Sequence, residues 1–393
     1  MSPLQESRAP GPEVWTPESL ARGAVAVIDL DALRHNLAVL QAVAPRQQVL
    51  AVVKADAYGH GLVPVARAAV EAGATWLGVA LPDEALALRA AGVDARILSW
   101  LLVPESPFDA LVAADVDITV SGLWSLDLVV KAVAAVGRPA RVQLKLDSGL
   151  SRNGSTFAEW PELVAAARAA EVDGHVVVTG VWTHFANADV PTHASVVRQL
   201  ETFREAIALA EVAGLRPEVR HAANSAATFA VPEAHFDLVR VGIAMYGLSP
   251  GAGIGTADEL GLRPVMTLLA RLASAKRVPS GSGVSYGHLY TTLHETTLGV
   301  VPLGYADGIP RAASNVGPVF AAGRLRTIAG RVCMDQVVLD LDDADAHMGD
   351  QVVIFGAGGP SADMWGEVCG TIGYEIVTRL GPRVPRTYLG VAP

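Results

Sequence analysis

The sequence is poor in cysteine and in long apolar runs. Cys333 and Cys369 are its only cysteines, too few for a disulfide scaffold or a thiolate metal site. No stretch reaches about 18 uninterrupted apolar residues, so we expect no membrane-spanning helix. The opening segment, residues 1–18, is rich in Pro, Glu and Ser and lacks the apolar core of a secretory signal. We therefore expect a cytoplasmic protein with a flexible N-terminal arm over residues 1–20.

Charge is also scarce. Charged residues make up 18% of the chain, below the roughly 25% of an average soluble protein, while 51% are hydrophobic. So apolar a chain is expected to bury extra surface in an oligomer. The net charge of −10 argues against nucleic acid or an anionic membrane as a partner, because both require a positive field. A local cationic pocket stays compatible with this net charge.

The first two thirds of the chain alternate between short apolar runs and helical stretches rich in alanine and leucine, a pattern typical of parallel strands joined by helices. Eight such strands close a barrel. We therefore predict an α/β fold whose residues 21–255 form a (β/α)8 TIM-type barrel. The candidate strands are Val49 to Ala55, Trp76 to Leu81, Arg96 to Trp100, Asp117 to Ser121, Arg141 to Asp147, Val176 to His184, Glu218 to Asn224 and Leu238 to Tyr246. The candidate helices are Leu62 to Glu71, Pro82 to Ala91, Ser125 to Val136, Pro161 to Ala170 and Ala194 to Ala213.

After a glycine-rich stretch, Pro250 to Gly261, the pattern of residue types changes. Beyond it the pattern is β-branched, with turn residues and almost no helix signal, so residues 256–393 are predicted to form a mostly β domain. Its glycines at 251, 253 and 255 follow no sharp strand and open no periodic helix, which favours a linker over a phosphate loop. The strand candidates here are Val278 to Tyr286, Thr297 to Leu303, Leu325 to Asp342 and Gln351 to Phe355.

Polar side chains gather where the predicted barrel strands end, which is where barrel enzymes carry their active residues. Ser225 and the backbone around Gly242 and Ile243 offer hydroxyl and amide donors to a phosphate. A lysine beside such a cradle suits pyridoxal phosphate, which needs an amine for a Schiff base and an anchor for its phosphate. For Lys54 the alternative is a structural ion pair. The strand-end residues are Lys54, Arg152, His184, Asn224, Ser225, Arg240 and Gly242.

The segment around Lys54, Ala51-Val-Val-Lys-Ala-Asp-Ala-Tyr-Gly-His-Gly61, closely resembles the cofactor-lysine signature of the alanine racemases, which are pyridoxal-phosphate enzymes of fold type III. The resemblance continues in the family order across both predicted domains, so it covers essentially the whole chain after the N-terminal arm. The further motifs are Lys145-Leu-Asp-Ser-Gly-Leu-Ser-Arg-Asn-Gly154, Trp182-Thr-His-Phe185, His221-Ala-Ala-Asn-Ser-Ala226, Val239-Arg-Val-Gly-Ile-Ala-Met-Tyr-Gly247, Val284-Ser-Tyr-Gly287, Gly304-Tyr-Ala-Asp-Gly308, Cys333-Met-Asp-Gln336 and Gly373-Tyr-Glu375.

The resemblance implies a pair of acid/base groups. Racemisation removes the proton of the α-carbon from one face and returns a proton on the other, so two groups must flank the cofactor. By family likeness these are Lys54 and Tyr286. Both normally titrate at about pH 10, and nearby positive charge lowers such pKa values; Arg152 and His184 are the candidates beside Tyr286. The alternative for Tyr286 is a half-buried strand tyrosine.

The resemblance also implies a homodimer with shared active sites, because Tyr286 of this family's second domain reaches the barrel of the partner subunit. Tyr305, Met334 and Asp335 would come from the partner as well and restrict the substrate pocket. The alternative for these three is ordinary packing and turn structure, and methionine in particular is a good gap-filler.

Arg240 is implied to bond the pyridine nitrogen of the cofactor. A permanently charged donor keeps that nitrogen unprotonated, which limits side reactions, whereas similar barrel-fold decarboxylases use an acidic residue there. Lys145 matches a lysine that many members carry as a carbamate, which positions Arg152. The remaining implied cofactor contacts are Tyr58, Asn224, Ser225, Gly242, Ile243 and Tyr374. The sequence departs from common family residues at Asp56, Ser151 and Asn153.

These residues predict a pyridoxal-phosphate-dependent isomerase that interconverts L- and D-alanine, with D-alanine supplied for peptidoglycan precursors of the cell wall. An alternative is a racemase for serine or a wider set of amino acids, because a rejected hydroxyl or methylene changes selectivity by only about 10- to 200-fold. Another alternative is a non-catalytic pyridoxal-phosphate carrier, since a fold does not fix a chemistry. Such carriers lack the second domain and therefore the equivalent of Tyr286.

Overall fold

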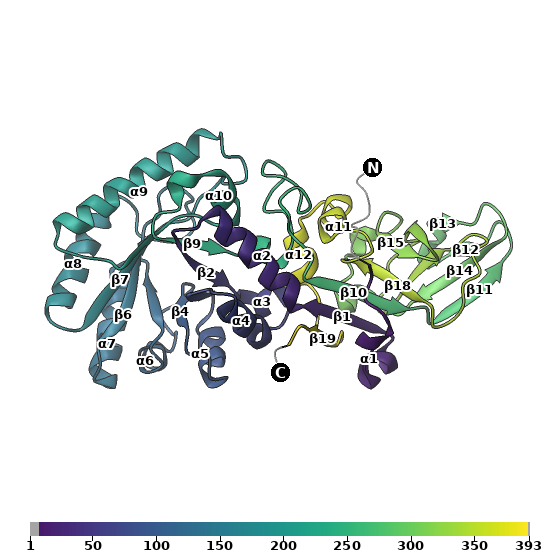
Figure 1. The fold of residues 1–393 in the computed structure, drawn as a ribbon, viewed down its shortest axis with the longest axis horizontal. Helices are drawn as coiled ribbons and strands as arrows, with labels where there is room; N and C mark the ends of the chain where they lie inside the picture. Colours follow the sequence, from purple (N-terminus) through teal and green to yellow (C-terminus); the bar gives the residue numbers. More distant parts are fainter. Residues whose placement is uncertain (1–7, 392–393) are drawn as a thin grey trace.

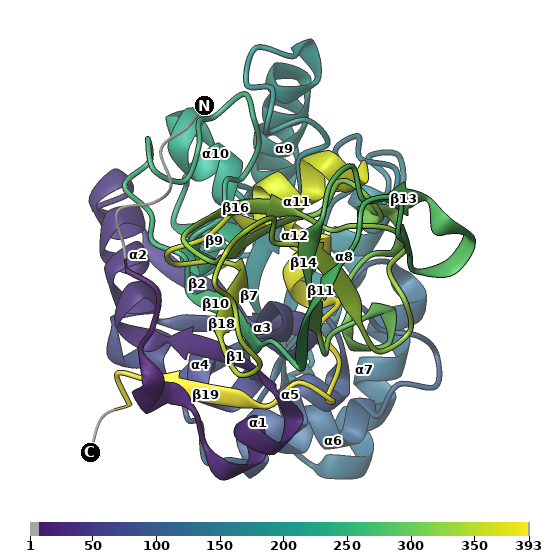
Figure 2. The same ribbon diagram turned by 90° about the vertical axis from the view of Figure 1, so that its right-hand side faces the viewer.

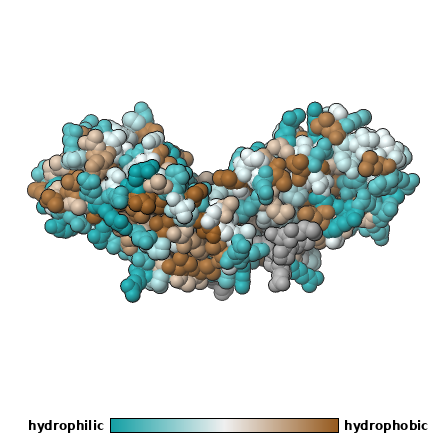
Figure 3. Space-filling model, turned by 90° about the horizontal axis from the view of Figure 1, so that it is seen from above, coloured by the Kyte–Doolittle hydropathy of each residue, from teal (hydrophilic) through white to brown (hydrophobic). Residues whose placement is uncertain are grey.

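The computed structural model describes residues 8–391 and places two domains side by side, the barrel on the left of Figure 1 and a mostly β domain on the right. Figure 2 looks onto the β domain, with the barrel behind it. In Figure 3 the two domains appear as two lobes, with hydrophobic residues gathered on the barrel lobe near the junction. Both parts of the predicted fold class are therefore present.

The barrel contains the eight predicted strands, all parallel, in the order β8-β7-β6-β5-β4-β3-β2-β9. Backbone hydrogen bonds from Arg240 N to Ala223 O (2.9 Å) and from Asp237 N to Arg220 O (3.1 Å) link β9 to the β8 segment, so the barrel is nearly closed. The strands are β2 (Gln48–Val52), β3 (Trp76–Val79), β4 (Arg96–Ser99), β5 (Asp117–Val120), β6 (Ala140–Lys145), β7 (Val176–Trp182), β8 (Val219–His221) and β9 (Leu238–Val241).

Helices cover the outside of the barrel (Figure 1). In α9, Val196, Leu200, Phe203 and Ile207 recur at helical spacing and are buried, which is the pattern of an apolar face packed on a sheet. All five helices predicted from the sequence are present, with ends shifted by two residues or fewer. The barrel helices are α2 (Leu30–Val43), α3 (Lys54–Gly59), α4 (Leu62–Glu71), α5 (Pro82–Ala90), α6 (Phe108–Ala113), α7 (Leu123–Val136), α8 (Trp160–Val172), α9 (Ala194–Val212) and α10 (Ser225–Ala230), with the 3-10 turns η2 (Pro232–Ala234) and η3 (Ile243–Tyr246).

The second domain contains a six-stranded sheet of order β16-β15-β18-β10-β1-β19, a three-stranded sheet β11-β14-β17 and the hairpin β12-β13. Two helices that the sequence pattern did not indicate, α11 (Ala362–Cys369) and α12 (Gly373–Thr378), lie near its C-terminal end, and α12 packs on α3 of the barrel. The strands are β10 (Met266–Arg271), β11 (Ser274–Val278), β12 (Gly283–Val284), β13 (Tyr290–Thr291), β14 (Thr296–Val301), β15 (Pro318–Ala321), β16 (Arg324–Thr327), β17 (Val337–Asp340) and β18 (Gln351–Phe355), with the 3-10 turns η4 (Tyr286–His288), η5 (Tyr305–Asp307) and η6 (Arg311–Ala313).

The strand β1 (Ala24–Asp29) lies within residues 21–255 but does not belong to the barrel. It pairs antiparallel with β10 and parallel with β19 (Arg386–Leu389), in the sheet of the second domain. The barrel strands begin only at Gln48, so the domain boundary predicted at residue 21 needs this correction. Ala24 to Ile28 are buried as completely as a barrel strand, and therefore their apolar pattern does not reveal which sheet they join.

The flexible arm predicted for residues 1–20 is wrong for its described part; residues 1–7 lie outside the described chain. Residues 12–22 form the turn η1 (Pro12–Val14) and the helix α1 (Pro17–Arg22). Val14 is fully buried, and Trp15 donates from Nε1 to Gln351 Oε1 at 3.0 Å. This segment therefore packs on the six-stranded sheet. Among residues 8–391, no helix is both long enough and apolar enough to cross a membrane.

Candidate active site

Lys54 stands at the mouth of the barrel, two residues beyond the end of β2, where it begins α3 rather than ending a strand. The four residues after it have left-handed backbone angles, with φ of 53–54° from Ala55 to Tyr58. Each L-residue in this region costs roughly 1–2 kcal/mol, so the turn stores strain directly beside the lysine. Strain of this kind is found most often at functional sites.

Hydrogen bonds from the surroundings hold this left-handed turn. Glu84 accepts from Ala55 N through Oε1, while its Oε2 accepts from the backbone of the β3–α5 loop. Asp56 Oδ1 accepts from Leu62 N at 2.7 Å, and Arg386 of the second domain donates to Gly59 O. The turn is thus fixed from α4, α5 and the C-terminal segment, which holds Lys54 in one place.

The amine of Lys54 is partly removed from water. Burial is the main cause that lowers its pKa, and the charge of Arg152 lowers it further. Its Nζ stands 5.9 Å from the ring centre of Trp100, for which the sequence pattern predicts only the end of a strand. Gly78 makes room for that ring, since a Cβ there would approach Trp100 Cζ3 to 2.7 Å. Trp100 is therefore part of the wall around Lys54.

Arg240 is buried at the centre of the site and donates to two histidines. Its Nη1 bonds His221 Nδ1 and its Nη2 bonds His184 Nδ1, both at 3.1 Å. Because a guanidinium can only donate, both Nδ1 atoms act as acceptors, which leaves each neutral ring its proton on Nε2. Burial, followed by the charge of Arg240, lowers the pKa of both histidines well below its ordinary value.

Positive side chains cluster around this arginine. Burial, Arg240 and Arg152 lower the pKa of Lys145 to about 7, and Lys145 Nζ lies 4.3 Å from the ring centre of Trp182. Lys54, Lys145, Arg152 and Arg240 all act electrostatically on His184, so the structure brings these five predicted residues together. The result is a local cationic cluster in a chain of net charge −10, suited to an anionic ligand.

A second group of predicted residues forms a cradle beside the cluster. Ser225 Oγ accepts from Gly242 N at 2.9 Å, and Asn224 caps α10 by accepting from Ala227 N at 3.0 Å. A Cβ at Gly242 would approach Tyr58 Oη to 2.6 Å, so only glycine leaves this space open. Hydroxyl groups and backbone amides at the starts of α10 and η3 are the donors that a phosphate requires. The residues present therefore fit a phosphate-bearing cofactor.

Tyr374 joins this cradle from the second domain. It lies on α12, with its ring centre 6.4 Å from that of Tyr58, which in turn lies 4.8 Å from that of Tyr246. Burial raises the pKa of Tyr58 and of Tyr374, so both phenols stay protonated and can donate. Ile243 follows Gly242 at the start of η3 and is buried.

The other second-domain residues lie elsewhere. Tyr286 begins η4, two residues beyond the end of β12, and its side chain is 72% exposed. Figure 1 shows the β12–β13 hairpin at the end of the molecule remote from the barrel. Tyr305 N donates to Cys333 O at 3.0 Å and Ala306 N to Met334 O at 2.9 Å. These bonds place the turn at Tyr305 beside the Cys333–Met334 segment, within the second domain.

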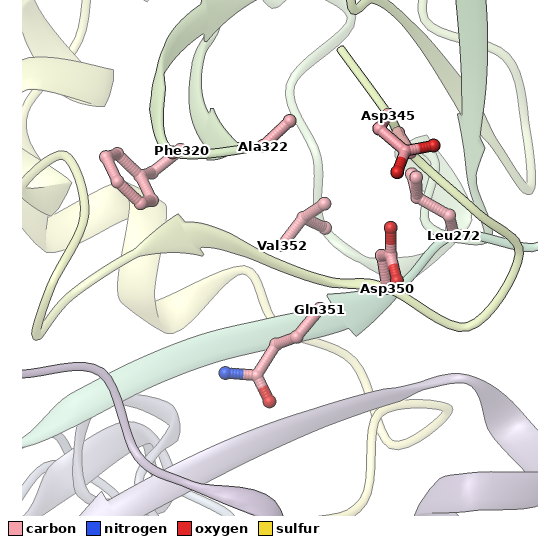
Figure 4. Close-up of a pocket in the computed structure, with 9 residues that line it drawn as sticks. Leu272, Phe320, Ala322, Asp345, Asp350, Gln351 and Val352 are labelled. Carbon is pink, nitrogen blue, oxygen red and sulfur yellow. The ribbon is translucent and has the colours of Figure 1, made fainter.

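Two cavities lie away from these residues. One, of about 290 Å³, is in the second domain and carries Asp345 and Asp350 on its wall (Figure 4). The other, of about 330 Å³, adjoins the start of β2, at the opposite end of the strand from Lys54. Neither contains a predicted site residue, and the paired carboxylates of the first would repel a phosphate.

The chain thus combines a (β/α)8 barrel and a mostly β domain with a lysine in a cationic cluster at the barrel mouth. The family model "Alanine racemase, N-terminal domain" matches residues 28–250, and "Alanine racemase, C-terminal domain" matches residues 265–388. The chain therefore belongs to the alanine racemase family, whose members are pyridoxal-phosphate-dependent isomerases.

Individual relatives agree with this family. The chain is 57% identical to the alanine racemase of Frankia casuarinae, over 93% of this chain and 96% of that one, and 58% identical to that of Streptomyces coelicolor, over 93% and 95%. The solved structure of alanine racemase from D-cycloserine-producing Streptomyces lavendulae superposes with a TM-score of 0.93 at 57% identity, covering 94% of this chain and 97% of that one.

Proposed function

We propose that this chain interconverts L- and D-alanine with pyridoxal 5'-phosphate as its cofactor. The observation that carries the proposal is the position of Lys54. Its amine, with a pKa lowered by burial, lies near Arg152, Lys145 and the neutral His184. The relatives that match over nearly the whole chain are alanine racemases.

The cofactor would be held at both ends. Tyr58, Ser225, Tyr374 and the backbone of Gly242 and Ile243 would bind its phosphate, while Arg240 would face the ring nitrogen. Burial lowers the pKa of Arg240 to about 9, so the guanidinium still carries its charge at neutral pH. When bound, the cofactor supplies a carbonyl for the amine of Lys54 and an electron-withdrawing ring that acidifies the α-hydrogen of the substrate.

The proton would move between two groups of this chain. Lys54 Nζ would accept or return it on one face, and Tyr286 of the partner subunit would do so on the other. The neutral His184, whose Nδ1 is occupied by Arg240, leaves its Nε2–H directed away from the guanidinium. Burial and the positive cluster lower the pKa of His184. His184 therefore stays neutral at the pH at which Lys54 and Tyr286 exchange the proton.

A homodimer follows from this arrangement, because Tyr286 lies remote from the barrel of its own chain. Large apolar side chains after β4 and β5 support it: Leu101, Val103 and Trp124 are 48%, 54% and 42% exposed. Exposed apolar side chains gathered at one place are typical of an interface. Tyr305, Met334 and Asp335 of the partner subunit would then restrict the substrate pocket to a small amino acid.

Arg152 would hold the substrate carboxylate, with Lys145 positioning it as a carbamate. The product D-alanine would serve peptidoglycan synthesis in the cytoplasm. Both assignments extend the proposed activity and depend on it.

The direct test uses the purified full-length chain. We expect cofactor-dependent racemisation of L-alanine, followed by circular dichroism. Borohydride reduction of the loaded protein should fix the cofactor on Lys54, located by peptide mass spectrometry. Lys54→Ala should abolish the trapped adduct, whereas Lys131→Ala, which removes an exposed lysine on α7, should leave it intact. A yellow protein that leaves L-alanine optically unchanged would overturn the proposal and favour a cofactor carrier.

A further inference from the structure

A line of buried polar side chains crosses the barrel behind Arg240. His221 Nδ1 accepts from Arg240 Nη1, and His221 Nε2 lies 2.8 Å from Gln143 Oε1. Gln143 Nε2 in turn donates to Asp117 Oδ1 at 3.4 Å. Asp117 is the first residue of β5 and His221 the last of β8, so the line runs from one end of the barrel to the other.

Every hydrogen bond along this line has only one possible direction. Arg240 can only donate, so His221 Nδ1 must accept, and the single proton of a neutral ring must sit on Nε2. Gln143 therefore accepts through Oε1 and offers its amide N–H to Asp117. A carboxylate can only accept, and Asp117 is held as one by Arg141 Nε at 2.9 Å. The line thus joins a buried cation to a buried anion.

The fold makes specific room for Gln143. Gly180 of β7 faces it, and a Cβ there would approach Gln143 Cδ to 2.8 Å. The β6–β7 ladder changes register between Val142 and Gln143, an irregularity of the kind that re-aims a side chain. Trp182 stacks on the His221 ring, with centres 5.6 Å apart and an interplanar angle of 4°. Ring and amide are therefore both fixed in orientation.

Asp117, at the far end of the line, is also held by several partners. Asp117 is 1% exposed and accepts from Thr179 Oγ1 as well as from Gln143. Arg96 faces it at 3.6 Å, and Glu218 pairs with Arg96 at the outer edge. Burial raises the pKa of Asp117 to about 6, so the carboxylate is charged at neutral pH. A buried charge without partners is strongly destabilising. The partners of Asp117 therefore indicate that the fold holds this carboxylate in a defined position.

We propose that Gln143 and Asp117 are positioning residues of the active site, which fix His221 as its Nε2–H tautomer and thereby hold the Arg240 guanidinium in place. In the other tautomer, Nδ1–H would face Arg240 Nη1 at 3.1 Å, two donors opposed, and the guanidinium would have to move. The consequence for catalysis depends on the proposed function, in which Arg240 faces the cofactor ring. The tautomer of His221 does not depend on the proposed function, because it can be measured without the cofactor.

The first experiment measures that tautomer in the cofactor-free protein. Long-range proton–nitrogen NMR of the ¹⁵N-histidine-labelled chain, with His221 assigned by loss of its signals in His221→Asn, should show Nε2 protonated and Nδ1 unprotonated. Gln143→Leu should remove this preference, and Gln143→Glu, whose protonated carboxyl can both accept and donate, should restore it. Thr119→Val is the matched control: Thr119 is buried in β5, and its hydroxyl has no hydrogen-bond partner within residues 8–391.

A wild-type His221 that carries its proton on Nδ1, or on both nitrogens, overturns the proposal whether or not any variant folds. So does a Gln143→Leu protein whose His221 signals match those of wild type.

The second experiment measures the loaded enzyme. Gln143→Leu leaves the tautomer of His221, and with it the position of Arg240, unfixed, so kcat for alanine should fall about tenfold or more. KM should change far less, because Arg240 does not touch the substrate. The pH at which the absorption band of the bound cofactor changes should shift as well, whereas in Thr119→Val all three quantities should stay near wild type.

The two proposals fail separately. A wild-type chain that does not racemise alanine defeats the proposed function but leaves the tautomer measurement standing. An active wild type, with a Gln143→Leu variant unchanged in kcat and in spectrum, defeats the positioning role alone.

Discussion

Gly242 lies directly against the phenol of Tyr58: a Cβ at Gly242 would stand 2.6 Å from Tyr58 Oη. Gly242 has φ −116° and ψ −102°, and its N–H is donated to Ser225. This contact sets the width of the cradle. The requirement for glycine therefore comes from space rather than from a positive φ.

Gly242→Ala should displace the Tyr58 hydroxyl and weaken cofactor binding. Overpacking of this kind costs about 1–3 kcal/mol, so we expect an affinity for pyridoxal phosphate about tenfold lower or more. Titration of the cofactor-free protein, followed by absorbance, measures it. The double variant Gly242→Ala/Tyr58→Phe removes the clashing oxygen and should recover part of the folding stability; a double variant as unstable as the sum of the single changes would argue against this contact.

Because the turn after Lys54 is left-handed, an alanine-to-glycine change there should stabilise the fold, whereas the same change destabilises a right-handed helix. Ala55 is exposed with φ 54°, so Ala55→Gly should raise the free energy of unfolding by about 1 kcal/mol. The matched control is Ala87→Gly, at an exposed position inside the right-handed α5, which should lower it by about 0.5–1 kcal/mol. Denaturant titration at one fixed protein concentration compares them. Two destabilised variants would mean that the turn is not left-handed.

The lowered pKa of Lys145 predicts the pH dependence of its carbamate. Carbon dioxide reacts with the neutral amine, and with a pKa of about 7 the neutral fraction of Lys145 grows as pH rises through that value. We expect a carbamate signal in ¹³C NMR with labelled bicarbonate that is weak at about pH 6 and strong at about pH 8. Lys145→Ala should remove it, and Lys131→Ala should not. A signal that survives Lys145→Ala places the carbamate elsewhere.

Selectivity for alanine over serine is expected to be moderate. The two substrates differ by one hydroxyl, and a pocket that excludes it gains about 10- to 200-fold in kcat/KM. Racemisation rates for both enantiomers of alanine, serine and lysine give the ratio directly. A preference for serine would replace alanine as the proposed substrate while leaving the two-base arrangement unchanged.

The sequence predicted the barrel well because its strands are apolar runs separated by periodic helices, a local pattern. It could not place β1, whose partners β10 and β19 lie more than 235 residues further along the chain. The packed segment around Trp15 was missed for the same reason: its composition is polar and rich in proline, and its burial depends on Gln351. Non-local contacts of this kind leave no periodic signal.

In the candidate site, too, the sequence predicted what local motifs indicate and missed what depends on contacts between distant residues. Motif likeness identified Lys54, Arg152, His184 and Arg240, and the structure gathers them at one place. Nothing in the run from Ala55 to Tyr58 signals four left-handed residues, since alanine and tyrosine rarely adopt them. The line through Gln143 was missed because a glutamine in a strand does not indicate its hydrogen-bond partners, here His221 and Asp117, which lie on other strands. The nearest signal was the alternation of the polar residues Arg141, Gln143 and Lys145 with apolar residues in β6.

The central claim is that each active site combines Lys54 of one chain with Tyr286 of another. Lys54→Ala and Tyr286→Phe should each reduce racemisation by about 10²-fold or more. Co-expression of the two variants under different affinity tags allows the mixed dimer to be isolated. That dimer contains one site with both native residues and one with neither, so we predict about half of the wild-type kcat per dimer. A mixed dimer as inactive as its parents would contradict the shared site.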